Sequence, residues 1–185
     1  GTAGPTDVLT DQGIIAVDDV IIAAGAFSKP LAAALGNTVP LDTERGYHMM
    51  LPEPRIDVRV PMLIPSMGFA ITPMDDGLRL AGTVEFAGLK AAPNYNRSEL
   101  LLRHAKKLFP KLNETGKKPW MGYRPSMPDS LPVISRSKRF DRVFFAFGHG
   151  HLGLSLGAVT GRVIADLLVD GATDIDIVPF RADRF

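Results

Sequence analysis

Two short segments combine residue types and spacings that suit ligand chemistry, and the first is Gly148-His-Gly-His-Leu-Gly153. Three glycines within six residues leave the backbone free of Cβ atoms, so it can approach a flat or anionic ligand closely. The helix expected after them offers free N–H groups and the positive end of its dipole. A tight strand-to-helix turn without any ligand fits the same spacing, because short glycine patterns are weakly specific.

The second segment is the run Trp120–Val133, in which Arg124 stands between Tyr123 and Pro125. Proline stiffens the backbone beside the arginine, and the planar guanidinium can bind a carboxylate through two parallel hydrogen bonds. Most arginines instead form surface ion pairs, and that interpretation stays open when the motif is taken alone. The segment therefore predicts a candidate carboxylate-binding arginine.

The glycine turn needs a strand before it and a helix after it. The run 143–147 is continuous and apolar, and the periodicity of 154–169 predicts a long helix. Residues 20–24 form a second apolar run, of the kind found in parallel strands covered on both faces, and Gly25 ends it. We expect the two strands to lie in one layer and to point in the same direction.

The part between these strands has a different character. Proline and glycine recur over residues 46–127, and the runs 68–72 and 78–84 are separated by residues that are typical of a hairpin turn. One helix is predicted over 98–109, where apolar residues form a stripe. The fold class is therefore expected to be α/β (α+β), with a mixed, largely antiparallel sheet and a packed helix in the middle part.

Polar residues near two predicted helix starts are the expected N-caps. A capping oxygen accepts a hydrogen bond from a first-turn N–H group, which has no acceptor within the helix itself. Ser28 is expected to cap a short helix over 29–35, and Asn96 or Ser98 to cap the helix over 98–109.

Bulk properties exclude several classes of function. The 21 Lys and Arg residues balance 20 Asp and Glu residues and are scattered, so no footprint for nucleic acid is present. The absence of cysteine excludes disulfides, thiolate metal sites and a thiol nucleophile. The apolar runs are far shorter than the roughly 20 residues of a membrane-spanning helix. The segment Gly1–Thr6 lacks a starting Met and a signal-peptide pattern, so the chain is expected to be cut from a longer protein.

Taken together, these motifs resemble the D-amino-acid oxidase family, which includes glycine oxidase, sarcosine oxidase and the bacterial D-amino-acid dehydrogenases. A colinear set of motifs is far more specific than any single member. The resemblance runs over nearly the whole chain, through the segments Val20–Ser28, Arg45–Tyr47, Asp76–Gly77, Gly82–Glu85, Phe109–Leu112, Gly122–Asp129 and Gly148–Ser155.

The resemblance implies roles for individual residues. In this family the arginine of the Gly-x-Arg-Pro motif binds the substrate carboxylate, a role that falls on Arg124. The other residues expected at the substrate are Tyr123, Tyr47 and His151. The final glycine turn packs against the flavin of FAD, and Gly25 falls where the family approaches the dinucleotide part of this cofactor. The cofactor contacts implied at the turn are Gly148, His149, Gly150, Gly153, Leu154 and Ser155.

The function implied is FAD-dependent oxidative deamination of a small (D-)amino acid by hydride transfer from Cα to flavin N5, with oxygen or a quinone as the electron acceptor. No catalytic acid or base and no metal ligand is assigned. Two alternatives are a glycine- or sarcosine-type amine oxidase of the same family and a non-catalytic binding or scaffold domain. The expected location is the cytoplasm or the inner face of the membrane as a peripheral protein, and a homo-oligomer is an expected assembly.

One departure from the family concerns the cofactor. No Gly-x-Gly-x-x-Gly follows a strand, and this fingerprint holds the FAD pyrophosphate. We therefore expect the amino-terminal dinucleotide-binding βαβ unit to be absent, with 1–45 and 128–185 as a discontinuous part of the FAD-binding domain and 46–127 as the substrate-binding domain. The chain alone is then expected to lack tightly bound FAD and amine-oxidase activity, and to expose an apolar patch.

Overall fold

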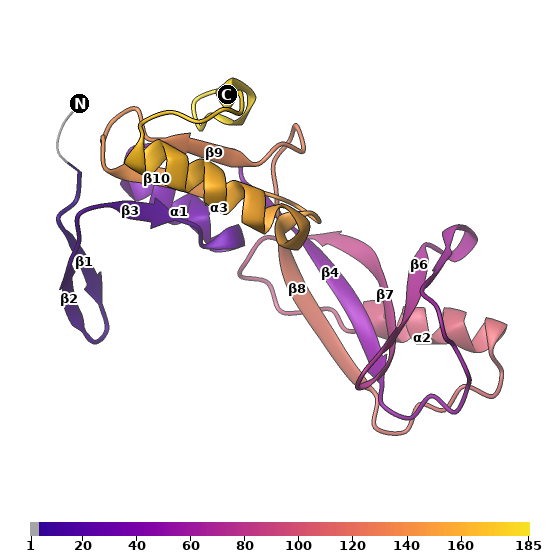
Figure 1. The fold of residues 1–185 in the computed structure, drawn as a ribbon. Helices are drawn as coiled ribbons and strands as arrows, with labels where there is room; N and C mark the ends of the chain where they lie inside the picture. Colours follow the sequence, from indigo (N-terminus) through magenta and orange to yellow (C-terminus); the bar gives the residue numbers. More distant parts are fainter. Residues whose placement is uncertain (1–3) are drawn as a thin grey trace. The chain divides into compact units, whose positions relative to one another are not determined.

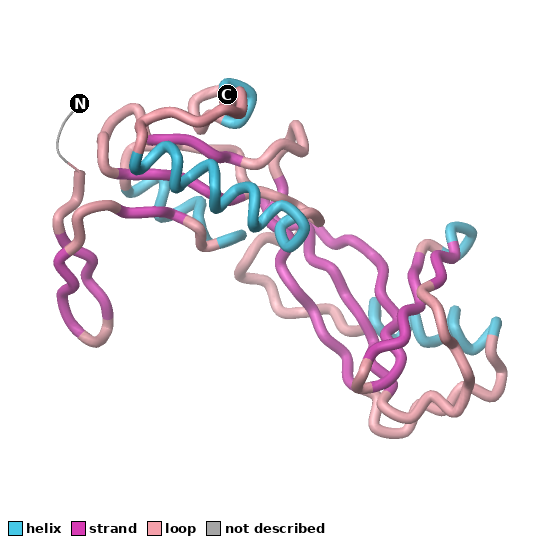
Figure 2. The backbone as a smooth tube through the Cα atoms, in the orientation of Figure 1, coloured by secondary structure: helices cyan, strands magenta, loops and turns pink. Residues whose placement is uncertain are grey.

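The chain folds into two compact units in a computed structural model that describes residues 4–185. Unit 1 contains the described residues up to Thr43 together with Arg124–Phe185, and unit 2 is Glu44–Tyr123. Figure 1 labels the helices and strands of both units, and Figure 2 colours the same backbone by secondary structure. Among residues 4–185, no helix has both the length and the apolar character needed to cross a bilayer.

Unit 1 is built on a three-stranded sheet. Strand β10 (Val143–Phe147) lies between β3 (Val20–Ile22) and β9 (Val133–Arg136). The pair β3 and β10 is parallel, whereas β9 is antiparallel to β10. The prediction that the runs 20–24 and 143–147 lie in one layer and point the same way is confirmed by this parallel pairing. The expected cover on both faces of the run 20–24 is wrong, because Ile21 is exposed on one face of β3 while Ile22 is buried on the other.

Alternation along the strands divides the apolar residues of unit 1 between two cores. On one face, Phe145 and Phe147 pack in a cluster that includes Ala32 of helix α1 (Ser28–Ala34). On the other face, Phe144 packs with residues of helix α3 (Gly153–Val169). Both faces of β10 are therefore covered, which explains why its sequence is continuously apolar rather than alternating.

A separate hairpin precedes this sheet in the chain. Strands β1 (Asp7–Thr10) and β2 (Gly13–Ala16) pair antiparallel as a two-stranded sheet. Most of its side chains are exposed, including the large apolar ones of Leu9 and Ile14.

Unit 2 contains a five-stranded sheet with the order β5-β6-β7-β4-β8. Its β5–β6, β6–β7 and β4–β7 pairs are all antiparallel, as the hairpin pattern predicted. The strands are β4 (Asp42–Leu51), β5 (Met62–Ile64), β6 (Phe69–Met74), β7 (Gly77–Phe86) and β8 (Lys118–Ser126).

The core of unit 2 forms where helix α2 (Asn96–Leu108) packs against the sheet. Its apolar stripe, which contains Leu101, Leu102 and Ala105, forms one buried cluster with alternate residues of β4, β6 and β7. The predicted helix over 98–109 is confirmed, and it begins two residues earlier.

The predicted helix caps are wrong. Phe27 stands at the N-cap of α1 and Tyr95 at that of α2, and neither helix has a side-chain capping bond. Ser28 is instead the first residue of α1, because the 3₁₀ turn Gly25–Phe27 leads directly into this helix. The hydroxyls of Ser28 and Ser98 are buried and accept no first-turn N–H.

Candidate functional site

The glycine turn of unit 1 follows the carboxyl end of β10. Gly148 has a φ of +84° and Gly150 a φ of +55°, both in the left-handed region that side chains rarely adopt. The Gly150 N–H donates to the carbonyl oxygen of Pro125 at 2.8 Å, which ties the turn to the residue after Arg124. Both glycines are therefore required by backbone geometry, independently of any ligand.

Packing around Gly148 leaves no space for a side chain. A Cβ added there would lie 2.8 Å from Cγ of Met127, which is buried. We expect Gly148→Ala to lower the free energy of unfolding by about 1–3 kcal/mol, because left-handed strain adds to this clash. Gly157→Ala is the matched control, since its Cβ would lie in open space inside α3, and it should be neutral or stabilising by about 0.5–1 kcal/mol. Urea unfolding measures both, and equal stabilities would contradict the account.

His149 lies between two apolar cavities of unit 1. Its Nε2 is 3.0 Å from the Thr160 hydroxyl, and burial lowers the pKa of the imidazole, which is therefore neutral at pH 7. One cavity, a groove of about 550 Å³, runs along α3 and over β3 and β10. The other, of about 280 Å³, lies between α3, the loop before β9 and the carboxy-terminal segment.

The groove is lined by small residues, which let a flat ligand or a helix approach closely. At every fourth position of α3 the lining residue is Gly153, Gly157, Gly161 or Ala165. Its rim contains Ile21 of β3, which is 45% exposed. Within residues 4–185, β3 pairs with β10 alone, so its other edge is unpaired. The expected exposed apolar patch is thus present in unit 1.

The other predicted cofactor contacts occupy different environments of unit 1. Gly25 begins the 3₁₀ turn after β3, and Gly148 follows β10, so the two glycines mark the carboxyl ends of adjacent parallel strands. Leu154 is 99% exposed, and Ser155 and His151 are also exposed. Gly148, His149, Gly150 and Gly153 come together at one turn, as their spacing requires.

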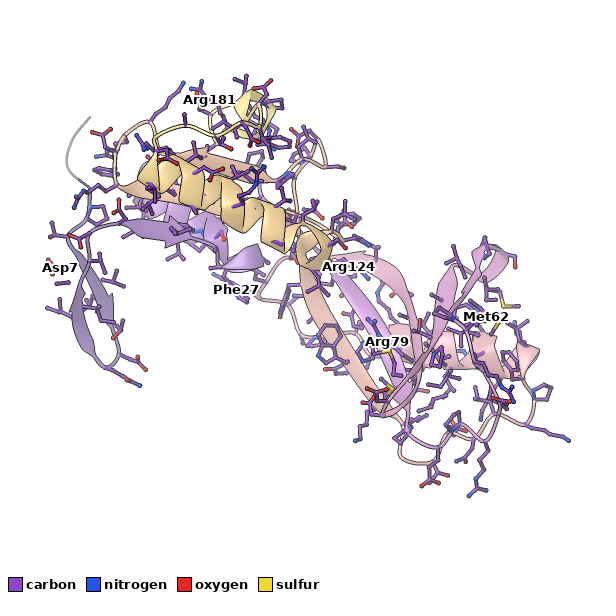
Figure 3. The ribbon with its side chains drawn as sticks, in the orientation of Figure 1. Asp7, Phe27, Met62, Arg79, Arg124 and Arg181 are labelled. Atoms are coloured by element: carbon purple, nitrogen blue, oxygen red, sulfur yellow. The ribbon has the colours of Figure 1, made fainter. Side chains whose placement is uncertain are left out.

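The predicted substrate residues are distributed over both units. Arg124 belongs to unit 1 and lies half-buried in β8 (labelled in Figure 3). Tyr123 belongs to unit 2, where its hydroxyl donates to the Leu89 carbonyl oxygen at 3.4 Å. Tyr47 is buried in unit 2, donates its hydroxyl proton to the Glu85 carboxylate and accepts the Asn94 N–H at 3.0 Å.

A buried ionic cluster in unit 2 was not predicted. The Arg45 side chain is fully buried and donates to the carbonyl oxygens of Gly88 and Ala91, both at 2.7 Å, and of Ala92 at 3.3 Å. Its guanidinium is also 3.6 Å from a Glu85 carboxylate oxygen and 5.5 Å from the centre of the Tyr123 ring. Arg45 therefore holds the loop 87–92 against the sheet.

Glu85 completes this cluster on the strand opposite. The hydrogen bond from Tyr47 lowers the pKa of the Glu85 carboxyl, and the nearby Arg97 and Arg45 lower it further. Register explains its position, because β7 has one extra residue, Thr83, between the partners of Gly46 and Tyr47. Such a bulge changes the alternation of side chains, so Glu85 shares a face with the buried Leu78 and Leu80 of β7.

His48 provides a pH-dependent probe in unit 2. Its ring stacks on Trp120 at 4.8 Å between centroids, and its Nδ1 accepts a hydrogen bond from Arg79 Nε at 3.3 Å. Burial lowers the pKa of His48 below 6.5, and Arg79 lowers it further, against the opposing effect of Asp76. The imidazole is therefore neutral at pH 7.

Because Trp120 is the only tryptophan, its fluorescence reports on this stack. We expect quenching on protonation of His48, with a midpoint below pH 6.5 that rises in Arg79→Met. The linked stability is present above the unfolded-state pKa of about 6.5 and is lost as pH falls through the lowered folded-state pKa. A midpoint at or above 6.5 in the unsubstituted chain would contradict the lowered pKa.

Comparison with known proteins adds to this geometry. A family model described as DAO, FAD dependent oxidoreductase, matches residues 2–167. A D-amino-acid oxidase of Bradyrhizobium diazoefficiens is 44% identical over 182 residues, covering 96% of this chain and 43% of its own length. A D-amino acid dehydrogenase of Xanthobacter autotrophicus is 34% identical over 184 residues, covering 97% of this chain and 44% of its own length.

A solved structure shares the fold. Glycine oxidase from Geobacillus kaustophilus superposes with a TM-score of 0.81 at 26% identity, over 97% of this chain and 49% of that protein. The chain thus spans less than half the length of each of these three proteins.

Proposed function

Because this chain belongs to the DAO family of FAD-dependent oxidoreductases, we propose that it supplies part of an enzyme that oxidises the Cα–N bond of a small D-amino acid. The observation that carries the proposal is the glycine turn of unit 1, which opens α3 beside a groove lined by small residues. The 44% identity to a D-amino-acid oxidase supports the choice of substrate class.

The turn and the groove suit a flavin. First-turn N–H groups of a helix have no acceptor within the helix, and they favour the negative charge that a reduced flavin carries near N1 and O2. The space beside Gly153 and Gly157 is open to a flat ring. A Cβ added at Gly157 would meet no atom within 4 Å, and a Cβ added at Gly153 would meet only His149 Cβ, at 3.7 Å. Bound FAD would supply the hydride acceptor. The proposed contacts are Gly25, Gly148, His149, Gly150, Gly153, Leu154 and Ser155.

The substrate is proposed to bind through its carboxylate to Arg124, whose planar fork offers two parallel donors. Fixing the carboxylate orients Cα–H toward the acceptor, and no side chain is assigned to move a proton in that step. Tyr123 and His151 are proposed to line this site. The hydroxyl of Tyr47 is already bonded to Glu85 and to the Asn94 N–H, so Tyr47 is proposed to hold the loop that contains Asn94 beside the sheet.

Roles for the two parts of the chain follow from these assignments. Residues 1–45 and 128–185 are proposed to belong to the FAD-binding domain, and 46–127 to the substrate-binding domain. The electron acceptor is proposed to be oxygen or a quinone. A glycine- or sarcosine-type amine oxidase is the second candidate, which the likeness to glycine oxidase from Geobacillus kaustophilus favours.

The proposal predicts that flavin binding needs the remainder of a full-length relative. The chain alone should purify colourless, since none of the contacts proposed for this chain is assigned to the FAD pyrophosphate. Co-expression with the part of the Bradyrhizobium relative that lies outside the match should give a yellow complex with one FAD. Absorbance near the flavin maximum measures the amount of bound FAD. The positive control replaces this chain with the matching segment of the Bradyrhizobium relative itself.

Gly161→Leu tests whether the groove along α3 is the surface through which the flavin-binding complex forms. Its side chain would fill space that is open in the chain alone, so the folded chain should persist while the complex is lost. A chain that binds FAD tightly by itself, or a complex unaffected by Gly161→Leu, would contradict the proposed arrangement.

A further inference from the structure

The carboxy-terminal tail of unit 1 holds the loop 127–132 through Arg184. The guanidinium donates to both carboxylate oxygens of Asp129, from Nε at 2.7 Å and from Nη2 at 3.0 Å. It also donates to the Leu131 carbonyl oxygen at 2.7 Å and to that of Arg181 at 3.0 Å. The Arg184 side chain is only 12% exposed, and a two-point contact of this kind fixes orientation as well as distance.

The loop that Arg184 holds is locally strained. Ser130 has a φ of +61°, which is unfavourable for a residue with a side chain. Such a conformation persists where surrounding contacts determine it. Here those contacts are the Ser130 N–H bonded to Met127 O at 3.0 Å and the Leu131 N–H bonded to Asp129 Oδ1 at 3.1 Å. Asp129 therefore fixes the loop from within, and Arg184 fixes Asp129.

The same loop supports the glycine turn. Met127 fills the space where Gly148 would otherwise accommodate a Cβ, at 2.8 Å from the added atom. Pro125, two residues before Met127, accepts the Gly150 N–H at 2.8 Å. A shift of the loop would therefore be passed to Gly148 through Met127, and to Gly150 through the end of β8 that carries Pro125.

We propose that Arg184 is a positioning residue for the cofactor turn, acting through Asp129 and the loop 127–132. In this assignment Arg184 touches neither substrate nor flavin. The effect on flavin binding rests on the proposed function, whereas the contacts of Arg184 with the loop do not. The alternative is that the Arg184–Asp129 pair only anchors the end of the chain and adds to overall stability.

Hydrogen exchange in the 185-residue chain separates the two possibilities. In Arg184→Met, the Gly150 amide should exchange about tenfold faster or more, relative to the Val163 amide of the α3 core, which reports global opening. Asp129→Asn should act in the same direction, and Arg184→Lys should restore only part of the protection because it lacks the planar fork. Arg181→Met is the matched control, since Arg181 pairs with Asp183 on the same tail.

Equal acceleration of Gly150 and Val163 would show a purely stabilising role and overturn the proposal. In the flavin-loaded complex, Arg184→Met is also expected to raise the Kd for FAD about tenfold, while Arg181→Met leaves it unchanged. Faster Gly150 exchange with an unchanged Kd would overturn the proposed effect of Arg184 on cofactor binding. If the unsubstituted complex binds no FAD, the proposed function fails, whereas the exchange result still decides whether Arg184 positions the turn.

Discussion

Arg124→Ala is expected to raise the KM for the amino-acid substrate between about 30-fold and several thousand-fold in the flavin-loaded complex. Removing one partner of a buried, charge-assisted pair costs about 2–5 kcal/mol, and each 1.4 kcal/mol corresponds to a factor of ten. Arg124→Lys should recover little of this loss, because a point charge cannot form two parallel hydrogen bonds. Steady-state kinetics over a range of substrate concentrations measure the effect.

The matched control for Arg124 is Arg142→Ala. Arg142 is an exposed residue of the same unit whose guanidinium is 3.6 Å from Asp18, and its loss should leave KM unchanged. Near-normal KM in both Arg124 variants would remove Arg124 from the substrate site.

Arg45→Met is expected to produce the largest loss of stability, about 3–5 kcal/mol in the free energy of unfolding. The methionine keeps part of the apolar stem but leaves three carbonyl oxygens of the loop 87–92 without their donor. Glu85 would also lose its buried cation. Urea unfolding followed by Trp120 fluorescence reports on the stability of unit 2, which contains both Arg45 and Trp120.

Arg59→Met serves as the comparison for Arg45. The Arg59 side chain is 84% exposed and pairs with Asp57, so its replacement should change the free energy of unfolding by less than about 0.5 kcal/mol. A similar small effect at Arg45 would mean that water replaces its contacts and that the cluster does not hold the loop.

The sequence could predict those parts of the fold that depend on local pattern. Continuous apolar runs identified the parallel pair β3 and β10, and the Asp75-Asp76-Gly77 turn identified the hairpin of β6 and β7. The need for glycine at Gly148 could also be anticipated, because a strand that turns sharply into a helix favours residues without a Cβ. Each of these features is determined by neighbours in the chain.

Features that depend on distant partners could not be predicted. Arg45 reads as an ordinary charged strand residue, and its acceptors lie more than 40 positions further along the chain. The bulge at Thr83, which places Glu85 beside Arg45, leaves no periodic trace in the sequence. Arg184 and Asp129 are separated by 55 residues, so only the folded tail brings them together. The N-cap expected at Ser28 failed because a preceding 3₁₀ turn displaced the helix start.

The most direct test of the proposed function is anaerobic reduction of the flavin in the complex with the remainder of the Bradyrhizobium relative. Addition of a small D-amino acid such as D-alanine should bleach the flavin absorbance, whereas the L-enantiomer should not, and Arg124→Ala should require far higher concentrations. A complex that binds FAD stoichiometrically but keeps its full absorbance with D-amino acids, glycine and sarcosine would contradict the account and favour a non-catalytic binding or scaffold domain.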